Sequence, residues 1–257
     1  MPALVTGASS GIGREVALAL GRRGARVGLV ARSRDKLDEV AHEVTTAGGQ
    51  ALVLPTDVID PAAVENTIAK VVETFGGLRI VVANAGLGRY APAEEQRLED
   101  VERLIRVNYL GTVNAVRHAL PHLLASAPSH VTAVASSAGF IPHRTGSAYC
   151  ASKAAVIQYL ATLRLEVAGR GVGVSWVCPG PVETPFFDGS NLDPHRDLPL
   201  LARMLVRMLQ PEEVARAVIR SVEKNRREIL QPAAIRFFAW TRRMSPVAAD
   251  WLNRRFP

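Results

Sequence analysis

Two residues four positions apart, Tyr149 and Lys153, have the types and spacing needed for proton transfer. Residues at this spacing share one face of a helix. A tyrosine hydroxyl can donate a proton to a carbonyl oxygen during reduction, but its ordinary pKa of about 10 makes it an inefficient base in the reverse direction. A nearby cation favours the phenolate and can lower that pKa by roughly 1–3 units. The pair therefore predicts acid–base chemistry on a ketone or alcohol; the alternative is an exposed tyrosine and lysine on a helix surface.

A glycine-rich loop near the start of the chain predicts a phosphate-binding site. Thr6–Gly13 reads Thr-Gly-Ala-Ser-Ser-Gly-Ile-Gly and joins an apolar run to an amphipathic segment. Glycines let the backbone turn sharply and approach a ligand closely, and a helix N-terminus offers free N–H groups. The spacing is G-x3-G-x-G rather than G-x-G-x-x-G, and no Lys-Ser/Thr pair follows as in a P-loop. We expect the pyrophosphate of a dinucleotide here; the alternative is a turn with a structural role alone.

The end of the second apolar run indicates which dinucleotide binds. NAD sites usually place an acidic residue about 20 residues beyond the glycine loop, where it binds the ribose 2′-hydroxyl. This chain has Ala31-Arg32-Ser33-Arg34 there and no carboxylate. The Arg32 guanidinium can instead bind a 2′-phosphate with paired donors. We therefore expect NADP(H) rather than NAD(H), unless Arg32 merely caps an exposed loop.

The elements that would position these residues alternate along the chain. Short apolar runs predict strands buried on both faces of a parallel sheet, over Pro2–Thr6, Arg26–Ala31, Gln50–Pro55, Leu78–Ala83, His130–Ala135 and Val172–Cys178. Amphipathic segments predict helices over Gly11–Arg23, Ser33–Ala47, Pro61–Phe75, Leu98–Ala125 and Ser147–Gly169, with another beginning at Pro211. This order predicts an α/β fold with a single Rossmann-like domain, in which helices cover both faces of a doubly wound, mostly parallel β-sheet.

Within that single domain, residues 1–257, we expect three functional parts. Residues 1–183 would form the cofactor-binding and catalytic core. Residues 184–210 are rich in Phe and Leu and predict an apolar lid over a bulky, lipophilic substrate, unless they simply pack on the sheet. Residues 232–257 would form a basic, amphipathic C-terminal extension.

Composition restricts the class of protein. With 257 residues, 48% hydrophobic and 21% charged, the chain is globular rather than disordered. Two cysteines, Cys150 and Cys178, argue against a disulfide-rich secreted domain and favour a cytoplasmic location. The longest stretch without charged residues, His118–His143, contains four histidines and three prolines, unlike a transmembrane helix. His118 and His122 lack a third ligand at metal-binding spacing, so no metal site is expected.

Several further motifs agree in order and spacing with one family. They are Asn84-Ala85-Gly86, Asn108, Ser136-Ser137-Ala138-Gly139, and Pro179-Gly180 with Thr184. Together with the glycine loop and the Tyr149–Lys153 pair, they make residues 1–184 resemble the short-chain dehydrogenase/reductase family. The Ala31-Arg32-Ser33 segment is most similar to its NADP-dependent, hydroxysteroid-dehydrogenase-like branch.

The resemblance implies a role for each matching residue. Tyr149 would be the catalytic acid/base, with Lys153 lowering its pKa and binding the nicotinamide ribose. Ser136 would bind the substrate oxygen, and Asn108 would hold a water for proton relay. The cofactor contacts it implies, together with the predicted loop and Arg32, are Gly7, Ser9, Ser10, Gly11, Ile12, Gly13, Arg32, Asp57, Val58, Asn84, Ala85, Gly86, Tyr149, Lys153, Pro179, Gly180, Val182 and Thr184. His143, which lies between Ser136 and Tyr149 in the sequence, is a candidate for the substrate mouth.

These residues predict an NADP(H)-dependent oxidoreductase that interconverts a secondary alcohol and a ketone on a steroid-, retinoid- or lipid-like substrate. Two alternatives stay open: a 3-oxoacyl-thioester reductase of the same family, and an NADP(H)-sensing regulatory protein without turnover. The resemblance also implies a homodimer or homotetramer formed through the helices at about 98–125 and 147–169.

The charge is uneven along the chain. The net charge is +7, and residues 196–257 hold the whole excess, with 13 basic and 6 acidic residues. Large apolar residues interleaved with arginine in Ala233–Pro257 suit peripheral contact with an anionic membrane. Docking on a partner subunit and closing the active site are the alternatives. Nothing in the sequence is typical of nucleic-acid binding.

Overall fold

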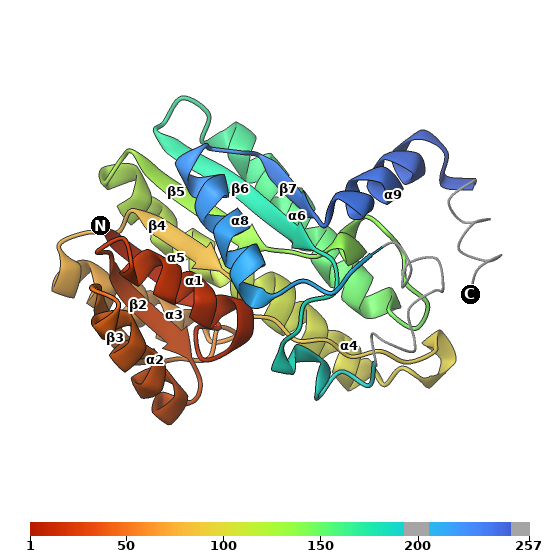
Figure 1. Ribbon diagram of the computed structural model, residues 1–257, viewed down its shortest axis with the longest axis horizontal. Helices are drawn as coiled ribbons and strands as arrows, with labels where there is room; N and C mark the ends of the chain where they lie inside the picture. Colours follow the sequence, from red (N-terminus) through yellow and green to blue (C-terminus); the bar gives the residue numbers. More distant parts are fainter. Residues whose placement is uncertain (193–205, 248–257) are drawn as a thin grey trace.

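Seven parallel strands form one sheet in the order β3-β2-β1-β4-β5-β6-β7 (Figure 1). The structure is a computed structural model that describes residues 1–192 and 206–247. The strands are β1 (Pro2–Thr6), β2 (Arg26–Ala31), β3 (Gln50–Pro55), β4 (Ile80–Ala83), β5 (Ser129–Val134), β6 (Val172–Pro179) and β7 (Glu228–Gln231). The predicted Rossmann-like fold is confirmed, and the described sheet is parallel throughout rather than mostly parallel.

Helices cover both faces of this sheet. On one face lie α1 (Gly11–Gly21), α2 (Arg34–Thr46) and α8 (Pro211–Glu223); on the other lie α3 (Pro61–Phe75), α5 (Gly111–Ala125) and α6 (Ser147–Glu166). All residues of β1 and β5 are buried. This burial on both sides explains why the strands appear in the sequence as continuous apolar runs.

The predicted bounds hold for β1, β2, β3 and α3 and differ by one to three residues in most other elements. Helix α3 begins as predicted because the Asp60 carboxylate accepts a hydrogen bond from the Ala63 N–H at 3.0 Å, with Pro61 next in the chain. Strand β7 has no counterpart among the predicted strands. Its four half-buried residues, Glu-Ile-Leu-Gln at the edge of the sheet, make no apolar run.

The long helix predicted over Leu98–Ala125 is interrupted. A π-helical turn over Ile105–Leu110 separates α4 (Leu98–Leu104) from α5. Such turns occur frequently at functional sites. This one carries Asn108, whose side chain is buried.

The winding of the chain marks a place for a ligand. The chain proceeds from β1 outward to β3 and then returns to β4 on the other side of β1. Ligands of open α/β sheets bind beyond the carboxyl ends of the strands at such a switch point. The glycine loop after β1 and the segments after β4, β5 and β6 all reach this edge.

The C-terminal extension begins as helix α9 (Ala233–Met244), which follows edge strand β7. Residues 193–205 of the predicted lid and residues 248–257 of the extension lie outside the described residues. In the part of the chain that the structure describes, no helix has the length and apolarity to cross a membrane.

Candidate active site

A cavity of about 990 Å³ opens at the carboxyl ends of the strands. The predicted site residues that line it are Gly7, Ser9, Ser10, Gly11, Ile12, Arg32, Asp57, Val58, Asn84, Ala85, Gly86, Ser136, His143, Tyr149, Lys153, Pro179, Gly180, Val182 and Thr184. Two others, Gly13 and Asn108, do not line the cavity. They lie directly behind residues that do: Gly13 against Gly7, and Asn108 against Gly86.

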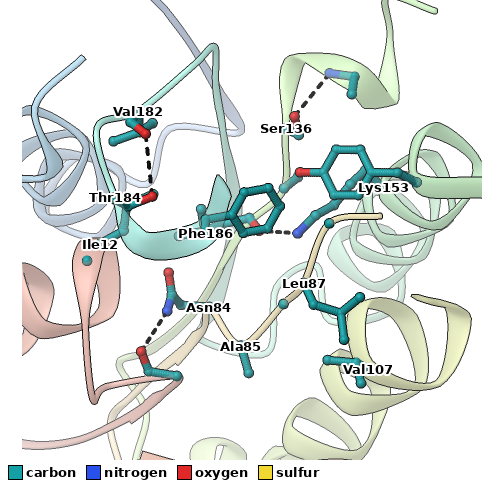
Figure 2. A pocket seen from close by; sticks show the side chains of 18 of the residues that line it. Ile12, Asn84, Ala85, Leu87, Val107, Ser136, Lys153, Val182, Thr184 and Phe186 are labelled. Carbon is teal, nitrogen blue, oxygen red and sulfur yellow. Dashed lines mark hydrogen bonds between the residues drawn. The ribbon is translucent and has the colours of Figure 1, made fainter. Parts of the chain in front are cut away.

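The glycine loop is held in place by hydrogen bonds between the ends of β1 and β4. The Thr6 hydroxyl accepts from the N–H groups of Asn84 and Ala85, both at 3.0 Å. The Asn84 amide donates to the carbonyls of Thr6 and Gly7 at 3.0 and 3.2 Å. Figure 2 shows one hydrogen bond from this amide. A Cβ at Gly13 would lie 2.1 Å from the Gly7 carbonyl oxygen, so helix α1 can pack this closely only with glycine there.

The loop fits the pyrophosphate of a dinucleotide. Gly7 and Gly11 have positive φ angles of 66° and 52°, which favour glycine. Ser10 precedes α1 in extended conformation, and its side chain makes no capping hydrogen bond. The first-turn N–H groups of α1 therefore face the cavity without a cap from Ser10, at the end of the helix that attracts anions.

Basic side chains lie where β2 ends. Arg32 lines the cavity as predicted, and so does Lys36 from the first turn of α2, which sequence reasoning did not include. Both are compatible with a phosphate on the adenosine ribose. No group of three or more His, Cys, Asp or Glu side chains among the described residues could hold a metal ion.

Tyr149 and Lys153 project from the first turns of α6 and are almost fully buried. The Lys153 Nζ donates to the Val134 carbonyl at 3.2 Å and lies 5.9 Å from the centre of the Tyr149 ring. Figure 2 shows Lys153, Ser136 and Phe186 converging on the same part of the cavity. The helical spacing thus brings the phenol and the ammonium to one site.

The pKa of Tyr149 shifts upward, whereas the sequence predicted that Lys153 would lower it. Burial raises the pKa of Tyr149 to about 12, although hydrogen bonds with Ser136 and Tyr90 act to lower it. Burial also lowers the pKa of Lys153, to about 8. Loss of solvation is the largest cause of both shifts, so in the protein alone the Tyr149 phenol is protonated at neutral pH.

Ser136 ends up beside Tyr149 because β5 stops just before it. Its hydroxyl accepts from the Ala138 N–H at 3.1 Å and begins the short 3-10 helix Ser137–Gly139. Ser137, the neighbouring alternative, also lines the cavity. Ser136, unlike Ser137, interacts closely enough with Tyr149 to act on the pKa of the phenol; its predicted bond to a substrate oxygen stays a prediction.

The Asn108 side chain forms three hydrogen bonds within the protein. Its amide donates to the Leu87 carbonyl at 3.0 Å and to the Ser152 hydroxyl at 3.0 Å, and its oxygen accepts from the Leu87 N–H at 2.8 Å. A Cβ on Gly86 would lie 3.1 Å from Asn108 Oδ1 and 3.3 Å from Lys153 Nζ. Asn108 therefore positions the backbone after β4 next to the lysine; its predicted water relay stays a prediction.

Two further groups shape the cavity: Tyr90, which sequence reasoning missed, and helix α9, whose place at the active site was one of three alternatives for the C-terminal extension. The Tyr90 ring lies 5.3 Å from the Tyr149 ring and 5.6 Å from the His143 ring, measured between centroids. No motif includes Tyr90, so only its position in space reveals it. The second group comes from β7's successor α9, which contributes Ile235, Phe238, Thr241 and Arg242 to the cavity. Phe186, part of the predicted lid, lies 5.8 Å from the Tyr149 ring.

Comparison with known proteins agrees with this fold and assigns the chain to a family. Residues 2–194 match the family described as short chain dehydrogenase. An uncharacterized oxidoreductase from Staphylococcus epidermidis is 35% identical over 196 residues, which cover 76% of this chain and 84% of that protein. The protein is thus an oxidoreductase of the α/β class. More specifically, the chain belongs to the short-chain dehydrogenase family, as its motifs predicted.

Solved structures of similar sequence share the fold. A 3-ketoacyl-ACP reductase from Sinorhizobium meliloti has a TM-score of 0.79 and 34% identity, covering 89% of this chain and 96% of that one. An alcohol dehydrogenase from the archaeon Thermococcus sibiricus, complexed with 5-hydroxy-NADP, has a TM-score of 0.77 and 31% identity. The match covers 89% of this chain and 94% of that one. A 3-ketoacyl-(acyl-carrier-protein) reductase from Brucella melitensis, complexed with NADH, has a TM-score of 0.80 and 26% identity. The match covers 89% of this chain and 95% of that one.

Proposed function

We propose that the protein transfers a hydride between NADP(H) and a secondary alcohol/ketone pair, with Tyr149 as the acid/base. The observation that carries this proposal is that the Tyr149–Ser136 pair faces the same cavity as a glycine loop suited to pyrophosphate. One cavity therefore offers a proton donor, a hydrogen-bond partner for the substrate oxygen and a cradle for the cofactor.

The residues divide the work of ketone reduction. The bound nicotinamide supplies the hydride. Tyr149, whose pKa burial raises to about 12, stays protonated at neutral pH and donates its proton to the carbonyl oxygen. Ser136 hydrogen-bonds the same oxygen and polarises the carbonyl. Lys153 binds the nicotinamide ribose and, in the direction of alcohol oxidation, stabilises the phenolate.

The cofactor is NADP(H) in this proposal. Arg32 and Lys36 line the cavity beyond β2, and no carboxylate stands at the end of that strand to bind a ribose 2′-hydroxyl. The similar solved structures carry a modified NADP in one case and NADH in another. Relative use of NADPH and NADH therefore tests the contribution of Arg32.

The substrate is lipophilic in this proposal, in line with the hydroxysteroid-dehydrogenase-like branch. Large apolar side chains line part of the cavity, and Phe186, Phe187 and Leu192 among them pack in one cluster with Tyr149. The others are Val206, Ile235 and Phe238. Such a surface suits a steroid-, retinoid- or lipid-like ketone. A 3-oxoacyl thioester is the second candidate, because two similar structures are named as 3-ketoacyl reductases.

Assembly and location complete the proposal. We expect a cytoplasmic homodimer or homotetramer formed through α4–α5 and α6, with the C-terminal extension in contact with an anionic membrane. Leu110 and Leu165 are large apolar residues that these helices expose, and such residues favour an interface.

The test is NADPH consumption across steroid, retinoid, aliphatic and 3-oxoacyl carbonyl compounds, with Tyr149→Phe as the control. We expect turnover of at least one lipophilic ketone and a loss of at least about 10³-fold in the variant, with NADPH binding retained. Highest kcat/KM on a 3-oxoacyl thioester would favour the second candidate. Full activity of Tyr149→Phe would overturn the mechanism, and NADPH binding without any turnover would favour a sensing protein.

A further inference from the structure

Helix α9 presents two different faces. Ile235 and Ala239 are buried, and Phe238 and Arg242 on the same side line the cavity. The outer face consists of Phe237, Trp240 and Met244, which are 61%, 58% and 69% exposed. These three follow one another at helical spacing, so they form one continuous apolar stripe. In Figure 1 the helix lies at the periphery of the molecule, beyond edge strand β7.

The apolar residues on the outer face are concentrated rather than scattered. Nine large hydrophobic residues are exposed in the described part of the chain, and four of them lie between Phe237 and Val247. The Phe237 and Trp240 rings lie 6.4 Å apart, so they form a contiguous aromatic surface. Isolated exposed apolar residues are ordinary, but a contiguous patch marks an interaction site.

The charge of the helix indicates the partner. Helix α9 contains Arg236, Arg242 and Arg243 and no acidic residue. Arg243 is held by an ion pair with Glu228 at 3.3 Å and lies over the Phe140 ring, whereas Arg236 is exposed beside the aromatic stripe. Aromatic and aliphatic groups flanked by arginine are complementary to a phospholipid surface with anionic headgroups.

We propose that the outer face of α9 binds an anionic phospholipid surface, and that the lipophilic substrate enters the cavity beside this helix. The first part assigns the membrane contact of the proposed function to one face of one helix. The second part rests on the lipophilic substrate of that proposal. The geometry joins the two parts: the helix whose outer face would sit in the headgroup region is also a wall of the cavity, through Phe238 and Thr241. A substrate dissolved in the bilayer would then reach Tyr149 without crossing water.

Sedimentation with vesicles tests the surface without any measurement of activity. The full chain is mixed with vesicles of phosphatidylcholine alone and of phosphatidylcholine with phosphatidylglycerol. We expect binding to the anionic vesicles that weakens with added salt, and a loss of at least about tenfold in the double variant Phe237→Ser, Trp240→Ser. Leu98→Ser is the matched control, since Leu98 is 76% exposed on α4. It should bind like the wild type, and because α4 belongs to the proposed subunit interface its molar mass is compared with that of the wild type by sedimentation equilibrium.

Three results would overturn the proposal: no binding by the wild type, equal binding to both vesicle types, or unchanged binding by the double variant. If the double variant instead halves the molar mass in sedimentation equilibrium, the outer face is an interface with a second copy of the chain. Turnover of a small water-soluble ketone should be equal in the wild type and the double variant, which shows that both are folded. Lack of turnover in both would contradict the proposed function and leave the vesicle result standing.

Discussion

Two parts of the same cavity are built in different ways. The polar floor consists of Asn84, Ser136 and Lys153, with Thr6 and Asn108 behind them. It is fixed by hydrogen bonds between side chains and backbone at or beyond the ends of β1, β4 and β5. The apolar wall, formed by Phe186, Phe187, Ile235 and Phe238, is held by ring contacts and partly buried surface.

The difference follows from what each part must do. Hydrogen bonds in a buried, poorly solvated site fix atoms closely, and losing one partner leaves the other unsatisfied. Apolar contacts tolerate changes of shape at smaller cost. The floor therefore suits chemistry that needs fixed geometry, and the wall suits selection among substrates. Substitutions in the floor should reduce turnover, whereas substitutions in the wall should alter KM and substrate preference.

After Tyr149→Phe, the largest effect is expected for Lys153→Met. Methionine keeps an unbranched side chain of similar length but removes the ammonium that donates to the Val134 carbonyl. We expect kcat to fall by about 10²–10³-fold, because the variant loses both the proposed contact to the nicotinamide ribose and the charge that would stabilise a Tyr149 phenolate. Steady-state kinetics on the best ketone measures this, and a fall of less than threefold would contradict the assignment.

The same variant gives a pH-dependent signal in stability. Burial lowers the pKa of Lys153 to about 8 from an ordinary 10.5, so between these values the unfolded state binds more protons than the folded state. The free energy of unfolding contributed by this residue therefore rises with pH, by roughly 2 kcal/mol between pH 8 and 9.5. Urea unfolding at the two pH values should show this rise in the wild type and not in Lys153→Met.

A smaller effect is expected for Arg32→Ala, at the edge of the floor. We expect KM for NADPH to rise about 10–100-fold, because a charge-assisted contact to the 2′-phosphate is lost, while kcat/KM for NADH changes little. Arg34→Ala is the matched control, since Arg34 is exposed on α2 and does not line the cavity. Equal losses with both cofactors would show that Arg32 does not read the phosphate.

The floor was largely predictable from the sequence, and the reason is physical. Its residues belong to short motifs at the ends of buried strands, and parallel strands bring their carboxyl ends to one edge. Thr6, Asn84 and Ser136 therefore come together once the strands are placed. The sequence could not show the balance of burial against charge that raises the pKa of Tyr149, because that depends on how deeply the phenol is enclosed.

For the wall, the sequence predicted only that apolar residues of the 184–210 segment would cover the substrate, and not which side chains would meet there. Tyr90 belongs to no motif and meets Tyr149 because the loop after β4 folds back, with its N–H donating to the Ser190 carbonyl at 2.9 Å. Strand β7 is too short and too polar to be recognised, so the placement of α9 at the cavity could not be derived from the sequence. It was one of three alternatives for that segment.

Tyr90→Phe tests the boundary between floor and wall. This change removes one hydroxyl that hydrogen-bonds Tyr149 and keeps the ring between Tyr149 and His143. Without that donor the pKa of Tyr149 rises further, so we expect alcohol oxidation to fall about tenfold and its pH profile to shift to higher pH, with ketone reduction less affected. Tyr159→Phe, which removes a hydroxyl remote from the cavity, is the control. An unchanged pH profile would assign Tyr90 to the wall.

The smallest effect is expected for Phe186→Leu, within the wall itself. The Phe186 ring lines the cavity 5.8 Å from the Tyr149 ring, and a Cβ on Gly88 would lie 2.7 Å from its edge, so the ring packs between Gly88 and Tyr149. Leucine keeps the site apolar but opens space, and we expect KM for bulky ketones to change by about two- to fivefold with kcat for a small ketone unchanged. Phe237→Leu on the outer face of α9 should leave both constants unchanged. If Phe186→Leu lowers kcat for all ketones equally, the ring positions Tyr149 and belongs with the floor. Substrate selection would then fall to the wall residues that α9 contributes.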